Sequence, residues 1–492
     1  MKYQSEVGYG NWHQARSAVL GRFSALATVV MIGGLVVSVV ANMAFGLMGL
    51  FTGFTVTALA TALIQYEPEG GHKLPTLLGI RMAWFRAKTR RESAFVGGLL
   101  NEKARGAAQL PGAGTAIELW DCQTGSGADF VLIEHKRVNA FSVVFETAPE
   151  GNDLVDAGVV DQRVAVWGAF LADLGYEPNL IGASVVVESA PDMGERLRNN
   201  IVPRLSEAAP AAAVATMEDV MATYPEGAAT TSAYVTLTWS GEHQKRSELA
   251  REIASRVPGL AAGLNGCGAG GISLVTAPRL ARIIRQSYDP DSAALFAEAD
   301  ALGQRVDVSW NDAGAIGAAA QWDCYLHEGA RSVTWEMSGA PRGIVRSSVL
   351  EHLLAPHHSM RRKRVTMLYT PISAAQTAKL VEENIRSADQ RVRGTQRASE
   401  RERKQQADAY KTASEEARGA GLVDFGMLVT VTDVFDGDFE PISAAVDGLA
   451  ASAKLRLRRC WGHQDSAFLV SLPLGVVPAR YDWAPAKLKE LM

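Results

Sequence analysis

The sequence is poor in cysteine and has no excess of one charge sign. Its 492 residues include four cysteines, Cys122, Cys267, Cys324 and Cys460, which lie far apart and form no CxxC pair. This spacing is not that of a zinc module or a disulfide scaffold, and it fits a reducing compartment. The formal net charge is −4, so no overall basic field attracts nucleic acid, and we predict no direct nucleic-acid binding.

The sequence also lacks the motifs of common catalytic sites. It has neither a G-x-x-x-x-G-K-[ST] phosphate loop nor a G-x-S-x-G nucleophile motif. Residues 266–271, GCGAGG, match G-x-G-x-x-G, but they follow a predicted helix and precede a predicted strand, the reverse of a dinucleotide-binding loop. His352, His357 and His358 are not spaced as HExxH, and Pro356 lies between them, which favours surface or capping roles. We therefore predict no catalytic, cofactor-binding or metal-ligating residue.

The dominant feature that is present is one long apolar run. From Phe23 to Tyr66 the sequence has no Asp, Glu, Lys, Arg or His. As a single helix this run would be about 66 Å long, whereas a bilayer core is about 30 Å thick and needs about 20 residues per crossing. A signal peptide has a shorter apolar core, and a buried core helix has a polar face. The run therefore predicts a two-helix transmembrane hairpin over 23–66, with its turn near residues 42–49.

Basic residues flank the apolar run on both sides. They are Lys2, Arg16 and Arg22 before it, and Lys73, Arg81, Arg86, Lys88, Arg90 and Arg91 after it. Cytoplasmic flanks of membrane helices are enriched in Lys and Arg, so both ends of the hairpin are expected on the cytoplasmic side. This predicts a multi-pass protein of the cytoplasmic (inner) membrane, with residues 1–22 as a cytosolic N-terminus and most of the chain as a cytosolic body.

The segment 67–95, directly after the run, alternates apolar and basic residues. Trp84 and Phe85 suit the headgroup boundary of a bilayer, and the basic residues suit anionic lipid. We interpret this segment as a juxtamembrane basic amphipathic helix at the membrane interface. An ordinary helix packed on the soluble body is the alternative.

The remainder of the chain contains an echo. The tripeptide Trp-Asp-Cys occurs at 120–122 and again at 322–324, and similar elements follow each copy in the same order. That order is hairpin, helix, proline-closed strand, long helix, strand, helix and strand. The pattern predicts an α+β fold of two related, ferredoxin-like units, 96–286 and 320–492, joined by a connecting segment, 287–319. Each Trp-Asp-Cys is expected to lie in the first strand of its hairpin, as a structural feature.

Two charged features are left over. The run RRKR at 361–364 precedes a predicted strand, so a solvated loop or a contact with lipid headgroups or a partner is expected. A long charged helix is predicted over 373–418, with almost no large apolar residues after Val392. Such a helix cannot bury itself in its own domain. It is either a projecting hairpin bent near Gly394 or a contact arm for another subunit, unless it is only a solvated face.

Several segments together resemble a known family. These are YGNW, VDQRVAVWGAFLADLGYEPNLIGASVVVESAPD, SVTWEMSGAPRG, LLAPH, KRVTMLYTP and GLVDFGMLVTVT. They resemble actinobacterial integral membrane proteins of conjugation-type gene clusters, which lie beside a type IV secretion ATPase. The N-terminal hairpin resembles the PrgI-type two-helix subunit. The C-terminal stretch is similar to the non-catalytic N-terminal domain of the secretion ATPase, and a weaker resemblance links the chain to EccE of type VII secretion.

The resemblance implies an assembly role without catalysis. It suggests a membrane-anchored scaffold that docks a secretion ATPase and contacts other membrane subunits, as an oligomer within a complex. Three alternatives remain open from the sequence. They are an EccE-like component of a type VII membrane complex, a membrane-bound enzyme whose site is not recognised, and a lipid or envelope factor held beside the bilayer.

Overall fold

The structure is a computed structural model of the whole chain. The residues that it describes are 8–10, 12, 18–20, 23–66, 74–90, 92–97, 110–149, 151, 155–191, 201–206, 208–223, 229–242, 244–304, 306–341, 343–394 and 399–481. Most of the predicted cytosolic N-terminus, 1–22, lies outside these residues. One part of it that is described, Tyr9, forms an isolated β-bridge with Val345.

Helices and strands are mixed along the chain. The α-helices are α1 (Ala25–Gln65), α2 (Leu74–Thr89), α3 (Ala157–Asp173), α5 (Ala211–Thr223), α6 (Arg246–Asn265), α7 (Ala277–Tyr288), α8 (Ser292–Ala301), α9 (Glu351–Leu354), α10 (Ala374–Arg393), α11 (Glu400–Glu416), α12 (Phe439–Ser452), α13 (Gln464–Ser471) and α14 (Pro478–Tyr481). The strands are β1 (Ala18–Leu20), β2 (Phe23–Ser24), β3 (Ala94–Val96), β4 (Ile117–Gln123), β5 (Asp129–His135), β6 (Ala140–Ala148), β7 (Leu180–Pro191), β8 (Ala229–Ser240), β9 (Gly271–Leu274), β10 (Gly317–Ala320), β11 (Tyr325–His327), β12 (Ala330–Gly339), β13 (Arg362–Pro371), β14 (Val423–Val434) and β15 (Arg456–Arg459).

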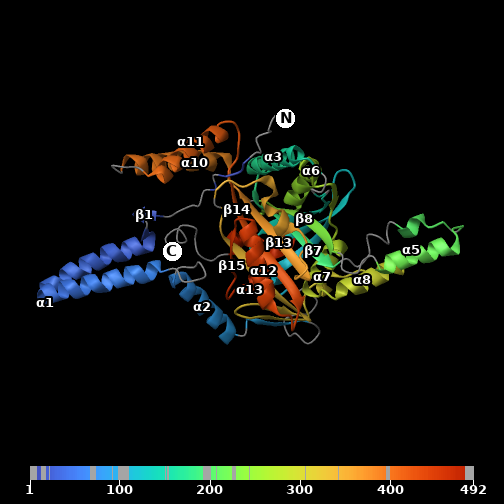
Figure 1. Cartoon of the computed structure of the whole chain (residues 1–492), viewed down its shortest axis with the longest axis horizontal. Coiled ribbons are helices and arrows are strands. Elements are labelled where there is room, and N and C mark those ends of the chain that lie inside the picture. The colour runs from blue at the N-terminus through green and yellow to red at the C-terminus, as the bar shows by residue number, and fades with distance from the viewer. Residues whose placement is uncertain are drawn as a thin grey trace.

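Helix α1 is long and apolar enough to cross a membrane. Its backbone leaves helical geometry at Gly46, where φ is 62°, inside the predicted turn region. The chain reverses there, and two antiparallel arms project from the body (Figure 1). A Cβ on Gly34 would lie 2.3 Å from Thr57 Cγ2, and one on Gly53 would lie 2.8 Å from Ser38 Oγ. Glycines at these positions therefore let the two arms approach closely.

The body is built on one large antiparallel sheet. Its thirteen strands run in the order β3-β10-β11-β12-β14-β13-β7-β8-β6-β5-β4, with β15 also pairing β12 and β9 also pairing β6. The strands are rich in Val, Thr and aromatic residues, which suit a pleated surface covered on both faces. In β8, for example, Thr236, Leu237, Thr238 and Trp239 are all buried, although they alternate between the two faces.

The sheet contains the same arrangement twice. In the first half the order is β9-β6-β8-β7, and in the second half it is β15-β12-β14-β13. The two halves meet where β7 pairs antiparallel with β13, with Val187 opposite Val365. Helix α3 follows β6 and helix α6 follows β8, while α9 and α12 take the matching places in the second half. We refer to the two halves as the first unit and the second unit.

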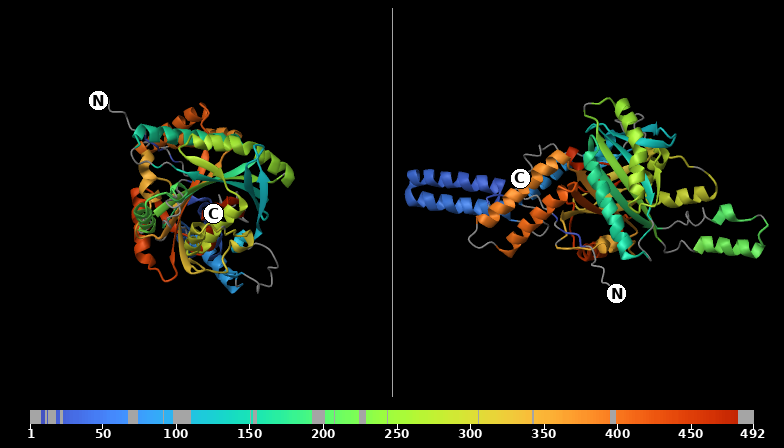
Figure 2. Two further views of the ribbon diagram at one scale, coloured as in Figure 1. Left: turned by 90° about the vertical axis from the view of Figure 1, so that its right-hand side faces the viewer. Right: turned by 90° about the horizontal axis from the view of Figure 1, so that it is seen from above.

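Helices cover both faces of the sheet (Figure 2). On one face, α3 and α6 pack on the first unit through Phe170, Leu249, Ile253 and Val257, and α9 and α12 pack on the second unit. The other face carries the largest core cluster, which includes residues of α7, α13 and both units. Helix α7 follows the last strand of the first unit, and α13 follows the last strand of the second. Both contribute to this shared core.

Two sequence-based predictions are wrong in detail. The second Trp-Asp-Cys lies in a bend before β11 and not in a strand, whereas the first lies in β4 as expected. The RRKR run is no loop, because residues 362–364 belong to the central strand β13. The charged helical segment 373–418 takes the form of the predicted hairpin: α10 ends with Gly394 as its C-cap, and α10 and α11 pack on each other.

Candidate membrane and docking interfaces

The two arms of α1 expose apolar side chains all round. Met43, Phe45, Met48 and Phe51 are each more than 60% exposed. An apolar groove of about 640 Å³ also runs along the hairpin, lined by residues of both arms that include Gly34, Thr52 and Val56. Water would penalise so large an apolar surface, while lipid would not. This surface is suited to a bilayer or to other membrane helices.

Helix α2 connects this hairpin to the body through aromatic contacts. Trp84 meets Trp322 edge-on, with ring centroids 5.4 Å apart, and Trp322 stacks on Trp461. Gly462, with φ of 78°, leaves room for this contact, because a Cβ there would lie 2.6 Å from the Trp322 ring and 3.0 Å from Ile80. The second Trp-Asp-Cys therefore helps to form the docking site of α2.

The opposite face of α2 is apolar and exposed. Leu78, Met82 and Phe85 are 55%, 73% and 65% exposed. Their spacing of four and three residues places them on one stripe of the helix. The two sequence interpretations of this segment are thus compatible: one face of α2 packs on the body, and the other presents an apolar stripe next to the hairpin.

A buried ion-pair cluster lies where the two units meet. Arg364 in β13 donates to the Glu188 carboxylate in β7, with Nε 2.7 Å from Oε2, and Arg362 lies 3.2 Å from the same carboxylate. Burial raises the pKa of Glu188, but the two guanidinium groups outweigh it and hold that pKa below its usual range. Arg364 also donates to Ser287 in α7 and Ser471 in α13. The run therefore has a structural role, because the side chains of Arg362, Lys363 and Arg364 are buried. Arg361 is partly exposed.

Each unit also has a buried histidine bonded to a serine. His135 Nε2 lies 3.1 Å from Ser142 Oγ, and His327 Nε2 lies 2.7 Å from Ser332 Oγ. A Ser–His pair is the starting geometry of nucleophilic catalysis. Here both histidines are about 1% exposed, and burial lowers the pKa of each to about 4. The pairs are neutral at pH 7 and have no route to a substrate, so we assign them to the core.

The residues singled out in the sequence lie apart from one another. Asp323 forms ion pairs with Arg331 and Arg459 beside the α2 docking site. Residues 266–271 end α6 and lead into β9, as expected for a helix stop. His357 and His358 stack, with ring centroids 4.5 Å apart. The structure does not bring these residues together into one site.

Sequence reasoning missed two features because residues distant in the chain form them. They are a cluster around Glu336 and the small pocket near α8 that is described next. Glu336, Cys460 and His463 offer ligand atoms within 4.8 Å of one another and could hold a metal ion. Arg458 Nε already donates to Glu336 at 2.8 Å, and burial raises the pKa of the Cys460 thiol, so both groups are poorly prepared to ligate a cation. The residue pattern of β12 does not predict this cluster, because only the tertiary fold brings the start of α13 next to the strand.

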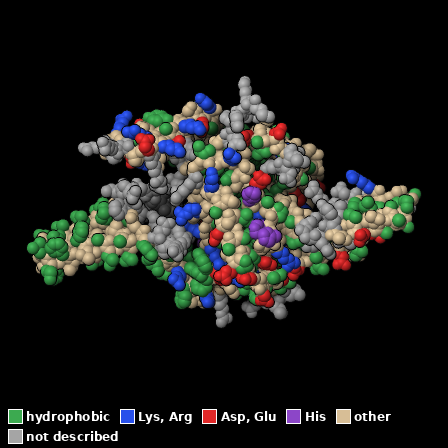
Figure 3. All heavy atoms as spheres, in the orientation of Figure 1, with side chains coloured by type: hydrophobic (Ala, Val, Ile, Leu, Met, Phe, Trp, Pro, Cys, Tyr) green, Lys and Arg blue, Asp and Glu red, His purple; other side chains and the backbone are tan. Residues whose placement is uncertain are grey.

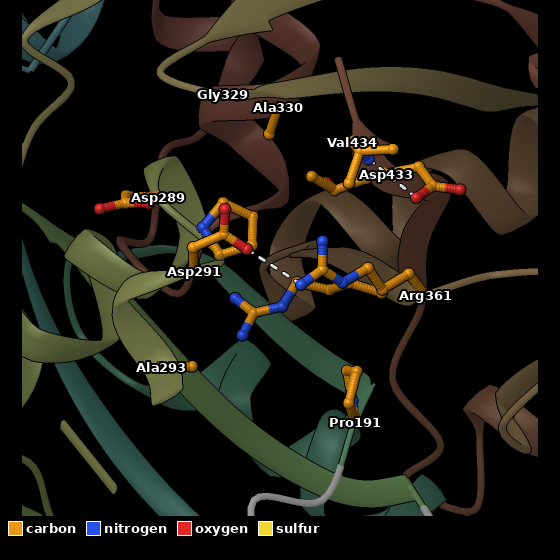
Figure 4. A pocket seen from close by; sticks show the side chains of 12 residues that line it. Pro191, Asp289, Asp291, Ala293, Gly329, Ala330, Arg361, Asp433 and Val434 are labelled. Atoms are coloured by element: carbon orange, nitrogen blue, oxygen red, sulfur yellow. Dashed lines mark hydrogen bonds and ion pairs between the residues drawn. The ribbon is translucent and has the colours of Figure 1, made fainter. Parts of the chain in front are cut away.

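A small pocket lies near the start of α8. It is lined by Pro191, Asp289, Pro290, Asp291, Ala293, Gly329, Ala330, Arg361, Arg362, Thr432, Asp433 and Val434. Figure 4 shows Arg361 and Asp291 facing each other across it, joined by an ion pair of 2.9 Å. Its volume of about 20 Å³ is room for one water molecule. An organic substrate would not fit.

Two helical projections extend from opposite ends of the body (Figure 1). The α10–α11 hairpin projects on the side of α1, and α5 projects on the other side. Asp389 in α10 accepts hydrogen bonds from Gln406 Nε2 and Tyr410 Oη of α11, which fixes the two helices together. Ser399 and Glu402 form a capping box that begins α11. The polar α10–α11 hairpin therefore offers contact surface without forming a core.

No protein-family model matches the chain, and a search of curated proteins finds no match. The surfaces of α1, α2 and the α10–α11 hairpin are therefore the features that bear on function.

Proposed function

We propose that this protein is a non-enzymatic scaffold subunit of a conjugative, type IV-like secretion system. In this proposal α1 anchors the chain in the cytoplasmic membrane, and the body docks a secretion ATPase on the cytoplasmic side. The single observation that carries the proposal is the exposed apolar hairpin α1, joined to a body from which a polar helical arm projects towards the same end. A molecule with these two features can hold a bound protein partner at a membrane.

The membrane topology follows from the hairpin. Each arm of α1 has about 20 residues, the length that one bilayer crossing needs. Basic residues lie beyond both ends of the hairpin, including Arg81 and Arg86 of α2. We propose two crossings with both termini in the cytoplasm. The aromatic docking of α2 then fixes the body against the membrane.

The body supplies the docking function. Each unit has an antiparallel strand order, β9-β6-β8-β7 or its equivalent, with two helices on one face, which supports a ferredoxin-like assignment. The proposal for the partner comes from the C-terminal stretch of the second unit, whose sequence resembles the non-catalytic N-terminal domain of a secretion ATPase. The ATPase and other membrane subunits of the complex are the proposed partners.

The direct test is co-purification from membranes. The full chain, tagged and co-expressed with a type IV secretion ATPase of the class that the resemblance implies, should retain that ATPase in detergent. A matched chain carrying only residues 1–95, with the same tag, should not. A monodisperse full-length protein that never captures the ATPase would contradict the proposal, and selective capture of type VII membrane subunits would assign it to the EccE-like class instead. Protease added outside intact cells should leave the body uncut.

A further inference from the structure

The α10–α11 hairpin is electrically polarised along its length. Its tip carries the cations Arg391, Arg393, Arg403 and Lys404, against Glu400 and Glu402. Its base, residues 374–383 and 415–418, carries Lys379 and Arg418, against Glu382, Glu383, Glu415 and Glu416. The part between tip and base has no net charge, with Arg386 and Lys411 against Asp389 and Asp408. The described tip therefore has a formal charge of 4 − 2 = +2, and the base has 2 − 4 = −2. We call the four cations Arg391, Arg393, Arg403 and Lys404 the arm tip.

The two acidic groups at the tip lower its charge to this net +2, and both are engaged by neighbours within the arm. Glu402 is occupied by the capping box, where it accepts from the Ser399 backbone at 2.7 Å. Glu400 pairs with Arg403 at 3.3 Å, but their side chains are 90% and 63% exposed. An exposed pair of this kind contributes little and exchanges readily with another anion.

The arm tip lies at the end of the body from which α1 emerges. Two perpendicular views show α10 and α11 extending from the body in the direction of α1 (Figures 1 and 2). In the space-filling view, Lys and Arg side chains with fewer Asp and Glu appear over the arm, on the same side of the body as the apolar surface of α1 (Figure 3). Helix α2, whose apolar stripe includes the exposed Met82 and Phe85, begins beside the base of α1 (Figure 1). Basic and apolar surfaces thus share this side of the molecule, as contact with a bilayer and its headgroups requires.

We propose that the arm tip binds the headgroups of anionic phospholipids in the leaflet beside which the body lies. The proposal rests on the membrane anchoring proposed above. A cytoplasmic leaflet rich in anionic lipid has a negative surface potential, and each Lys or Arg near it gains about fivefold in partitioning. The attraction decays within a Debye length of about 8–10 Å, so only the basic tip and not the acidic base would feel it. The arm would be a second contact with the membrane, after α1, and would set the tilt of the body relative to the bilayer.

The test uses the full chain in lipid nanodiscs. Amide hydrogen exchange of the arm is measured in discs of neutral phosphatidylcholine and in discs that also contain phosphatidylglycerol. Exchange around Arg391–Arg393 and Arg403–Lys404 should slow several-fold in the anionic discs, and the effect should vanish when the salt concentration is raised to about 0.5 M. Exchange near Lys379 and Lys411 should be the same in both discs.

A pair of matched variants separates charge from fold. The variant Arg403→Gln/Lys404→Gln removes two cations from the tip, and Lys379→Gln/Lys411→Gln removes two from elsewhere on the arm. The first should lose the lipid-dependent protection and the second should keep it. Equal exchange of the wild-type tip in both discs would overturn the proposal while leaving the anchor intact, and so would protection that depends only on added ATPase. A chain that never enters discs would overturn the anchor, and this proposal with it.

Discussion

The two units place the same polar row in different surroundings. In each, a histidine, a serine and a threonine on neighbouring strands form a buried hydrogen-bonded row: His135, Ser142 and Thr238 in the first unit, and His327, Ser332 and Thr432 in the second. The remaining ring nitrogen differs. His327 Nδ1 bonds the carbonyl of Tyr288, which ends α7, whereas His135 Nδ1 bonds the hydroxyl of Tyr481.

This difference shows that the units exchange their terminal segments. The chain after the first unit reaches the histidine of the second, and the chain after the second unit reaches the histidine of the first, where Leu474 also contributes its carbonyl. Each row is therefore completed by the other half of the molecule. The body should unfold as one structure, although it is built from two similar units.

The units differ most at their junction, and there the largest effect is expected. Arg364 occupies the position opposite Thr430, as Ser184 does opposite Thr236 in the first unit. Replacing Arg364 by Met leaves Glu188 buried with one cation and removes the bonds to α7 and α13. We expect a loss of about 3–5 kcal/mol in the free energy of unfolding. Urea unfolding of the detergent-solubilised chain would measure it.

The matched control is Arg361→Met, which lies three residues before Arg364 and just outside β13. Arg361 is partly exposed and pairs with the exposed Asp291, so its loss should cost less than about 1 kcal/mol. Equal effects of the two substitutions would show that the buried ion pairs of Arg364 and Glu188 do not stabilise the junction between the units.

Acid should weaken both polar rows together. The pKa of His135 and of His327 is about 4 in the folded protein, below the ordinary value of 6.5. Between these pH values the unfolded chain binds the protons and the folded chain does not, so stability is full above pH 6.5 and falls as the pH drops to 4. Each histidine should account for about 3 kcal/mol by pH 4.

The check is the urea midpoint measured at steps between pH 7 and pH 4. The variants His135→Phe and His327→Phe should each be destabilised at pH 7 and should each flatten the pH dependence by a similar amount. If only one of them flattened it, the two rows would not be equivalent despite their shared geometry.

Helix α2 docks on the second unit, through Trp322 and Gly462. A substitution that releases α2 should therefore affect the second unit and not the first. In Gly462→Ala, the new methyl group would meet Trp322 and Ile80 at a positive φ. We expect a cost of about 1–3 kcal/mol. Hydrogen exchange should rise across Leu74–Thr89 but not in α6, which covers the first unit. Gly448→Ala, inside α12 with no atom within 4 Å, is the control and should stabilise slightly, by up to about 1 kcal/mol, because alanine favours the helix.

Much of the fold could be predicted from local patterns. The apolar run, the order of elements and the turn around Gly46 are written in composition and periodicity, and the structure has each of them. A resemblance suggested the function, and that function stays a prediction. The sequence could also indicate the arm, because its residues are too polar for a core.

The errors share one physical cause. A run of four basic residues normally lies in solvent, but Arg362 and Arg364 are buried because Glu188, 176 residues from Arg364, is placed opposite it by the pairing of β7 with β13. Lys363, on the other face of β13, donates to the carbonyl of Ala355. The second Trp-Asp-Cys is a bend because its Trp322 packs against α2 and Trp461. Local patterns contain no information on these distant partners, so no reading of periodicity would find them.

The smallest effect concerns a hydrogen-bonded pair of hydroxyls that the second unit has and the first unit lacks. In the second unit, Thr334 and Thr430 bond each other at 3.0 Å. At the equivalent positions of the first unit, Val144 replaces one threonine, and the buried hydroxyls of Thr236 and Ser184 have no protein partner. Because a buried hydroxyl without a partner is unfavourable, Ser184→Ala should leave the free energy of unfolding unchanged or raise it by up to about 1 kcal/mol. Thr430→Val should instead lower it by about 1 kcal/mol, since Thr334 then loses its partner. A destabilised Ser184→Ala would mean that the hydroxyl is satisfied by water, and that the two units are equally complete.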